Sequence, residues 1–372
     1  MREPTRAMIS ARLPGLACIS VLCGILVAGL WPFQAPRNAV TWLKNQNGVH
    51  FGRHGTMVSS GAFSMAGSED SSSLEIWLQP GLPNASYTIL SFYTPENPLQ
   101  FSLHQYFSSL ILDRESQSRQ HRIGIESAFR PIRASFITIT SSAQQTTMYV
   151  DGALAGVFPQ FRLDHGLTGQ LVIGTSPVAS DTWSGELLGL AIYQQELTAA
   201  EVLQHYDTWA KQGRPVLSGN ERVIALYLFN EHAGNIVRNA VQGIDLYIPK
   251  RFSLLHQPFL QPFWKEYRRG WEHWGESVLI NIVGFVPLGF LFYAYWSYRR
   301  PIKRPVAVTT ILGLAVSLTI EVLQAYLPTR TSGTTDLVTN TLGTFLGVML
   351  YSSRIARALL AKAYGIPPSG NG

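Results

Sequence analysis

Two carboxylic acids of this chain lie in or beside long apolar stretches, where an ionised side chain is costly to bury. Glu321 occurs in the apolar segment 306–327, six positions before its end, and Gln324 follows three residues later on the same helical face. At a rise of about 1.5 Å per residue, Glu321 would lie about 9 Å below that end of a helix. An ionisable side chain at such a depth predicts a functional site.

Four further polar residues can join this pair. Asp336 and Asn340 are four residues apart near the start of the apolar segment 334–352, and Asn281 lies near the start of the segment 277–298. Glu321 and Asp336 could act as an acid–base pair with Arg330 as an anion clamp, or could pair with that arginine. If the segments pack together, we expect one pocket lined by Asn281, Glu321, Gln324, Arg330, Asp336 and Asn340.

The elements that would position these residues are four apolar segments, each long enough to span a bilayer as a helix. They cover residues 13–33, 277–298, 306–327 and 334–352. For the first, a cleaved signal peptide is the competing interpretation, and an uncleaved anchor is favoured because the apolar stretch is long and no clear cleavage site follows.

Basic residues near membrane ends favour the cytoplasm. Arginines and lysines gather in 2–12, 299–304 and 354–362. They predict a multi-pass protein of the plasma (inner) membrane. Tails 1–12 and 353–372 would be cytoplasmic, residues 34–276 would be extracytoplasmic, and all six polar residues would lie in or just above the outer third of the membrane. These clusters also account for the net charge of +6, so we expect no nucleic-acid partner.

Residues 38–250 have a different pattern, with short alternating strands separated by turn residues, as in SLEIWL, YTILSF, SFITIT and QLVI. Cys18 and Cys23, the chain's two cysteines, both lie in the first apolar segment, so this region has no disulfide framework. The predicted fold class is therefore a mixed membrane protein, with four transmembrane α-helices plus an all-β extracytoplasmic jelly-roll sandwich.

Four motifs make the sandwich prediction more specific: YVDG at a hairpin, an Ile-Gly pair, WSGE, and LTAAEVLQHY, which opens with a capping box from Thr198 to Glu201. On them, residues 65–210 resemble the concanavalin-like or laminin-G-like jelly-roll family. The later stretch 225–248 is either a late strand that pairs back onto the sheet, which we favour, or a degenerate second copy.

That resemblance implies glycan binding, sometimes with calcium. The oxygen ligands to consider are Asp70, Asp151, Asp164 and Asp181, and a sugar could contact Phe101, Tyr106 and Phe107. Turn and core roles explain these residues more simply, and the aspartate spacing matches no calcium loop. We therefore predict no metal site and no cofactor, and calcium in the sandwich is the alternative.

The segment 256–275 places Phe263, Tyr267, Trp271 and Trp274 on one side of a helix. That pattern predicts a helix lying in the outer membrane interface, and a connecting loop is the alternative.

The membrane segments carry a second resemblance. NIVGFVPLGFLF, followed by a Glu-x-x-Gln pair, an arginine and Asp-x-x-x-Asn-x-x-Gly-x-x-x-Gly, resembles the VanZ-like membrane family over residues 277–352. The resemblance implies a bacterial cell-envelope protein, since the family is named for resistance to the glycopeptide teicoplanin. This chain departs from the family pattern in one respect, the long insertion between its first and second apolar segments.

Three functions remain open from the sequence. The first, which we favour, is a non-enzymatic envelope protein that binds an amphiphilic or lipid-linked envelope molecule in its membrane part and a glycan or protein through its jelly roll. The second is an intramembrane enzyme acting on an envelope lipid or polymer through Glu321, Asp336 and Arg330. The third is a structural or adhesion protein, whose polar residues only hold the helices together. The oligomeric state is unknown.

Overall fold

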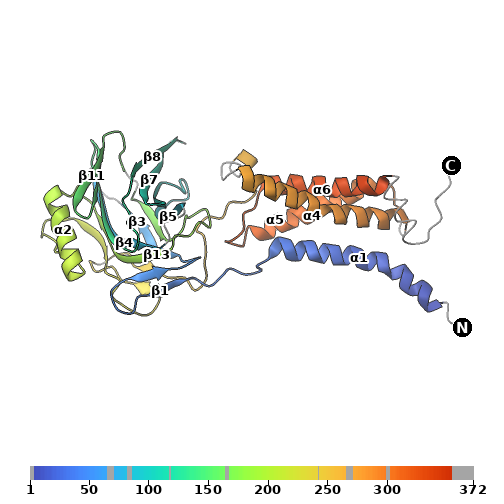
Figure 1. Ribbon diagram of the computed structural model, residues 1–372, viewed down its shortest axis with the longest axis horizontal. Helices are drawn as coiled ribbons and strands as arrows, with labels where there is room; N and C mark the ends of the chain where they lie inside the picture. The colour runs from blue at the N-terminus through green and yellow to red at the C-terminus, as the bar shows by residue number, and fades with distance from the viewer. Residues whose placement is uncertain are drawn as a thin grey trace. The chain divides into compact units, whose positions relative to one another are not determined.

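The computed structural model separates the chain into a helical unit and a β-sheet unit (Figure 1). The helical unit comprises Met1–Gln34 with Pro258–Gly372, and the β-sheet unit comprises Ala35–Gln257. The structure describes residues 4–64, 71–81, 86–116, 119–163, 167–241, 243–264, 271–298 and 302–353.

Two antiparallel sheets form the β-sheet unit. The first has the strand order β1-β2-β13-β4-β9-β10-β11, and β14 also pairs with β13. The second has the order β15-β16-β3-β12-β5-β6-β7-β8. The strands of the first sheet are β1 (Val40–Trp42), β2 (Val49–Phe51), β4 (Ser72–Pro80), β9 (Ser135–Ser141), β10 (Thr146–Val150), β11 (Ala153–Phe158), β13 (Gly185–Tyr193) and β14 (Val223–Tyr227). Those of the second are β3 (Met57–Phe63), β5 (Ser86–Tyr93), β6 (Phe101–Tyr106), β7 (Ser109–Ser116), β8 (Arg119–Ile125), β12 (Gly169–Ile173), β15 (Ile236–Val237) and β16 (Leu246–Tyr247).

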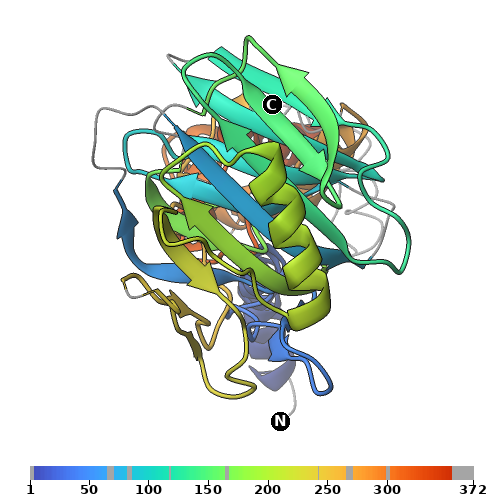
Figure 2. The same cartoon turned by 90° about the vertical axis from the view of Figure 1, so that its left-hand side faces the viewer.

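The core lies between the sheets because alternate side chains of each strand point inward. Ile76, Leu103 and Ile137 are among its fully buried members. The helix α2 (Ala199–Gln212) covers the outer face of the first sheet, as Figure 2 shows, and packs Val202 and Trp209 on that face. β4 and β13 are therefore buried on both faces, which explains their nearly continuous burial.

The all-β sandwich prediction is confirmed, together with its local signals. Asp151 and Gly152 have positive φ angles in the turn between β10 and β11. The Thr198–Glu201 capping box opens α2, and Gly213 ends it in the left-handed conformation. The stretch 225–248 pairs back as a late strand, since β14 pairs with β13 and β16 with β3.

In the helical unit, α4, α5 and α6 pack against one another, and α1 packs against α4 and α5 (Figure 1). The helices are α1 (Pro4–Leu30), α4 (Trp271–Tyr298), α5 (Pro305–Gln324) and α6 (Thr334–Ser352). Both α1 and α5 end three residues before their predicted ends. Each end precedes a proline, Pro32 or Pro328, which disfavours helical backbone at the residue before it.

Two helical stretches among the described residues are long and apolar enough to cross a membrane, Gly275–Ser297 and Pro305–Gln324. Pro14–Leu30 is a shorter apolar stretch, so helix length and composition alone do not establish four spans. Residues 265–270 of the predicted interfacial segment lie outside the described residues, and its end belongs to α4, which already begins at Trp271.

Candidate functional site

All six polar residues singled out in the sequence line one cavity of about 440 Å³ in the helical unit. Asn281 comes from α4, Glu321 and Gln324 from α5, Arg330 from the connection, and Asp336 and Asn340 from α6. Their spacing within each helix presents them on one face, and the packing of three helices brings those faces together.

Glu321 joins α5 to the start of α6. Its side chain is only 1% exposed, and its Oε2 accepts a hydrogen bond of 2.8 Å from the Gly333 N–H. Gly333 is the residue that precedes α6, where backbone N–H groups lack helical partners and the helix dipole favours negative charge. The Glu321 carboxylate is therefore buried, and the N–H and the helix dipole at the start of α6 compensate its negative charge.

The asparagines tie α6 to the other two helices. Asn281 Nδ2 donates to Asp336 Oδ1 at 2.7 Å, which joins α4 to α6. Asn340 Nδ2 donates to Ser317 Oγ at 2.9 Å, which joins α6 to α5. The other end of the Asn340 amide, Oδ1, is buried without a hydrogen-bond partner in the part of the chain that the structure describes. A buried acceptor of this kind calls for a water or a ligand.

Gln324 and Arg330 contact the C-terminal end of α1. Gln324 Nε2 donates to the Gly29 carbonyl at 2.8 Å, and the Arg330 guanidinium donates to the Trp31 carbonyl. The last carbonyls of a helix lack partners and carry partial negative charge, so an arginine is stabilising there. The arginine predicted as an anion clamp is thus engaged with α1.

Apolar side chains complete the cavity and make it amphiphilic. Ile25 of α1, Ile280 and Phe285 of α4 and Ile320 of α5 line it beside the polar residues. The contribution of α1 was not predicted, because its residues Ile25, Ala28 and Gly29 carry no polar signal and precede Glu321 by almost the whole chain.

The described sugar and calcium candidates of the sandwich have separate surroundings. Phe101 belongs to the core, whereas Tyr106 and Phe107 form an exposed edge-to-face pair with centroids 4.9 Å apart. Asp151 accepts from the Phe136 N–H at its turn, and Asp181 accepts from Thr88 Oγ1. Asp70 and Asp164 lie outside the described residues. Within those residues, no group of three or more His, Cys, Asp or Glu side chains could hold a metal ion.

The sandwich contains a buried ionisable cluster that the sequence did not reveal. His205 of α2 lies between two glutamates, with Nδ1 at 3.1 Å from Glu75 Oε1 and Nε2 at 3.3 Å from Glu221 Oε2. Tyr193 donates to Glu75 at 2.7 Å. Burial lowers the pKa of His205, but hydrogen bonds and charges from Glu75 and then Glu221 raise it more, so that the pKa lies above its ordinary value.

Comparison with known families finds two family models that match different parts of the chain. A family model described as VanZ/LLP1 matches residues 223–357, and one described as the concanavalin A-like lectin/glucanases superfamily matches residues 52–203. The chain contains a VanZ-like domain and a concanavalin A-like domain. No curated protein matches the chain.

Solved structures similar to parts of this chain include the following three. A heptameric SAP-like pentraxin from Limulus polyphemus is 15% identical with a TM-score of 0.36, over 58% of this chain and 96% of that one. The CBM40 of a Ruminococcus gnavus sialidase, bound to α2,3-sialyllactose, is 14% identical with a TM-score of 0.33, over 42% and 95%. A botulinum neurotoxin serotype G binding domain is 17% identical with a TM-score of 0.32, over 46% and 42%.

The VanZ-like match includes all six polar cavity residues, but its limits differ from the resemblance read at residues 277–352. It begins at residue 223, where β14 starts, and so includes the last strands of the sandwich. The helix α1 lies outside the matched residues, although Ile25 and Gly29 line the same cavity as the VanZ-like residues.

Proposed function

We propose that this protein is a cell-envelope membrane protein whose helical cavity binds the head of an amphiphilic or lipid-linked envelope molecule from the outer leaflet. The supporting observation is that six polar residues from α4, α5, α6 and one connection line a single cavity together with apolar side chains. Its volume of about 440 Å³ suits a small-molecule head group, and its mixed lining suits a ligand that is itself amphiphilic.

The lining favours a head group that donates hydrogen bonds. Two carboxylates, Glu321 and Asp336, face the same cavity as one guanidinium, Arg330. Asn340 Oδ1 and Thr329 Oγ1 are buried without hydrogen-bond partners among the described residues. Hydroxyl or amino groups would satisfy such acceptors, whereas an anionic head group would be repelled by the carboxylates.

The membrane part would be embedded through four spans, with both termini in the cytoplasm and residues 34–276 outside. The concanavalin A-like domain would bind a glycan or a protein of the envelope. A role in resistance to teicoplanin-type glycopeptides follows if the bound molecule belongs to cell-wall assembly.

The contacts also favour a second candidate, a purely structural role. Glu321, Asn281, Gln324 and Arg330 each make a hydrogen bond that joins two elements of the helical unit. The enzymatic alternative has Glu321 and Asp336 in a common cavity, and it requires their carboxylates for turnover.

Filling the cavity tests ligand binding directly. Gly284 lines the cavity, and a Cβ there would meet no atom within 4 Å, so Gly284→Leu adds bulk without a backbone clash. We expect the variant, extracted with its native membrane lipids, to retain at least tenfold less of the enriched amphiphile, measured by mass spectrometry. Gly24→Leu is the matched control, because Gly24 is an exposed α1 glycine with equal space around it.

Equal retention in Gly284→Leu and the control would reject the binding function. In the same experiment, Glu321→Gln distinguishes the structural role from the enzymatic one. Unchanged lipid retention with lower folded yield would support the structural role, and retention with loss of envelope function would support the enzymatic one.

A further inference from the structure

Two arginines lie opposite each other on the segments that join the β-sheet unit to the rest of the chain. Arg37 and Arg251 are partners in an isolated antiparallel β-bridge, and both side chains are exposed, as is that of the neighbouring Lys250. The Arg251 guanidinium donates to the Ala35 carbonyl at 2.8 Å, a contact that leaves its charge in place. Like charges directly opposite each other repel, so this pairing is unfavourable unless an anion lies beside it.

Asn38 holds a third basic segment beside this pair. Its Nδ2 donates to the Pro249 carbonyl at 2.8 Å and to the Thr56 carbonyl at 2.6 Å, and its Oδ1 accepts from the Thr56 N–H at 2.9 Å. Arg53 is exposed in the turn just before Thr56. These three segments together form what we call the basic patch, which consists of Arg37, Arg53, Lys250 and Arg251.

The charge of the basic patch is not paired within the protein. None of its four side chains forms an ion pair with another residue that the structure describes. The stretches 31–57 and 246–264, which contain the patch, include no aspartate and no glutamate. The β-sheet unit as a whole carries a slight excess of acidic residues, so the patch does not follow from the composition of the unit.

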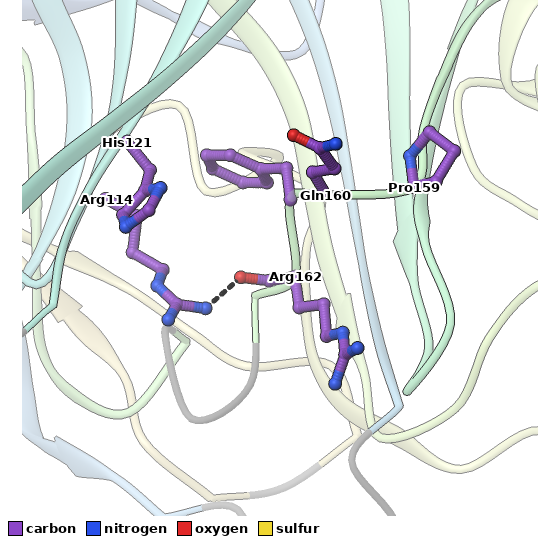
Figure 3. Close-up of a pocket in the computed structure, with 6 residues that line it drawn as sticks. Arg114, His121, Pro159, Gln160 and Arg162 are labelled. Carbon is purple, nitrogen blue, oxygen red and sulfur yellow. Dashed lines mark hydrogen bonds between the residues drawn. The ribbon is translucent and has the colours of Figure 1, made fainter.

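A second group of basic residues in this unit is engaged with the protein itself. It lines a cavity of about 270 Å³ at the edge of the sandwich, where Arg114 donates to the carbonyl oxygen of Arg162 (Figure 3). Arg162 follows β11, at one end of the first sheet, whereas Arg37 precedes β1, at the other end. Because the Arg162 side chain is exposed, this residue is a suitable control position for the patch.

Exposed aromatic rings of the helical unit precede and follow the basic patch along the chain. Trp31 and Phe33 come after α1 with ring centroids 5.8 Å apart, and Phe263 and Trp264 come before α4 with centroids 5.2 Å apart. Such rings are enriched at the level of lipid head groups, so they mark a membrane interface. Since Arg37 follows Phe33 by four residues, an extended chain separates their Cα atoms by about 14 Å at most.

We propose that the basic patch binds the anionic head groups of phospholipids in the bilayer that holds the helical unit. Guanidinium and ammonium groups donate to phosphate oxygens, and unpaired cations near an anionic membrane surface are attracted to it. A phosphate group between Arg37 and Arg251 would also relieve their mutual repulsion. Large domains cross a membrane largely regardless of their charge, so these cations are compatible with an extracytoplasmic sandwich. The inference rests on the membrane location in the proposed function and adds a lipid class to it.

Native mass spectrometry of the full-length protein in mixed micelles tests the lipid contact. From equal amounts of phosphatidylglycerol and phosphatidylcholine, we expect the protein to retain the anionic lipid preferentially. The double variant Arg53→Gln and Lys250→Gln should lower that preference about fivefold, because each cation near an anionic surface contributes to its attraction. Both side chains are exposed, so we expect an unchanged melting temperature.

The double variant Arg162→Gln and Arg214→Gln is the matched control, because it removes the same charge from exposed positions of the same unit. It should keep the preference. Equal retention of the two lipids by the unaltered protein, an unchanged preference in the patch variant, or an equal loss in the control would overturn the proposal. Loss of the preference on adding inorganic phosphate at constant ionic strength would identify a free-anion site and overturn the lipid assignment. Gly284→Leu should keep the preference, so that failure here is distinguishable from failure at the membrane cavity.

Discussion

At the scale of single residues, buried charges in both units are held by partners from other elements. Glu321 accepts an N–H next to α6, and His205 of α2 lies between Glu75 of β4 and Glu221. Removing one partner of such a group leaves the other buried and uncompensated, which is strongly destabilising. These side chains therefore couple the stability of one element to that of another.

The His205 cluster predicts how the stability of the sandwich depends on pH. The pKa of His205 in the folded state lies above the ordinary 6.5, because Glu75 and Glu221 favour its protonated form against the opposing effect of burial. The contribution of His205 to the free energy of unfolding is complete below about pH 6.5, and it is lost as the pH rises through the pKa of the folded state. The melting temperature of the sandwich should therefore fall as the pH rises above about 6.5.

Thermal unfolding of the full chain, followed by tryptophan fluorescence, measures this slope. Groups facing the imidazole are Glu75, Glu221 and Tyr193, and burial together with Glu75 raises the tyrosine pKa well above its usual range, so the phenol stays neutral throughout. His205→Gln should flatten this decline while lowering stability at every pH. The same decline in the variant would show that other groups cause it.

At the scale of elements, glycines set how closely the helices of the VanZ-like domain pack. A Cβ at Gly343 of α6 would overlap the Ile282 carbonyl of α4, and one at Gly347 would overlap the Val286 carbonyl. The four-residue spacing of these glycines is a pattern that lets another helix approach closely, and α4 lies in that position. The same close packing brings Asp336 and Asn340 beside α4 and α5.

Gly343→Ala should disturb this packing. The added methyl meets backbone, which cannot move aside without shifting a helix, so we expect a loss of about 1–3 kcal/mol in the free energy of unfolding. Unfolding in mixed micelles measures the change. Gly284→Ala is the control with equal chemistry but open space around its Cβ, and it should unfold like the unaltered protein. An equally stable Gly343→Ala would mean that α4 and α6 are not held this closely.

At the scale of the whole molecule, the distribution of basic residues predicts which ends of the helices face outward. Thr331 lies between α5 and α6, and Lys303 lies before α5 in the basic stretch 299–304. The positive-inside rule places the first outside and the second in the cytoplasm.

Cysteine labelling of intact cells checks this arrangement. After Cys18 and Cys23 are replaced by alanine, an impermeant maleimide should label Thr331→Cys directly, and Lys303→Cys only after the membrane is opened. Both introduced positions are exposed in the helical unit. Labelling with the opposite preference would place the cavity on the cytoplasmic side and would exclude an outer-leaflet ligand.

The sequence by itself determined the strands, the hairpin at Asp151-Gly152, the α2 cap and the faces on which the polar membrane residues lie. These features depend on periods and spacings within a few residues, which a linear pattern records. Only the tertiary structure decided that α1 helps to line the cavity and that the Gly29 and Trp31 carbonyls accept hydrogen bonds from Gln324 and Arg330. It also decided that Glu75 meets His205 across 130 residues. Such contacts depend on how faces of distant elements pack, and no local pattern of residues encodes that packing.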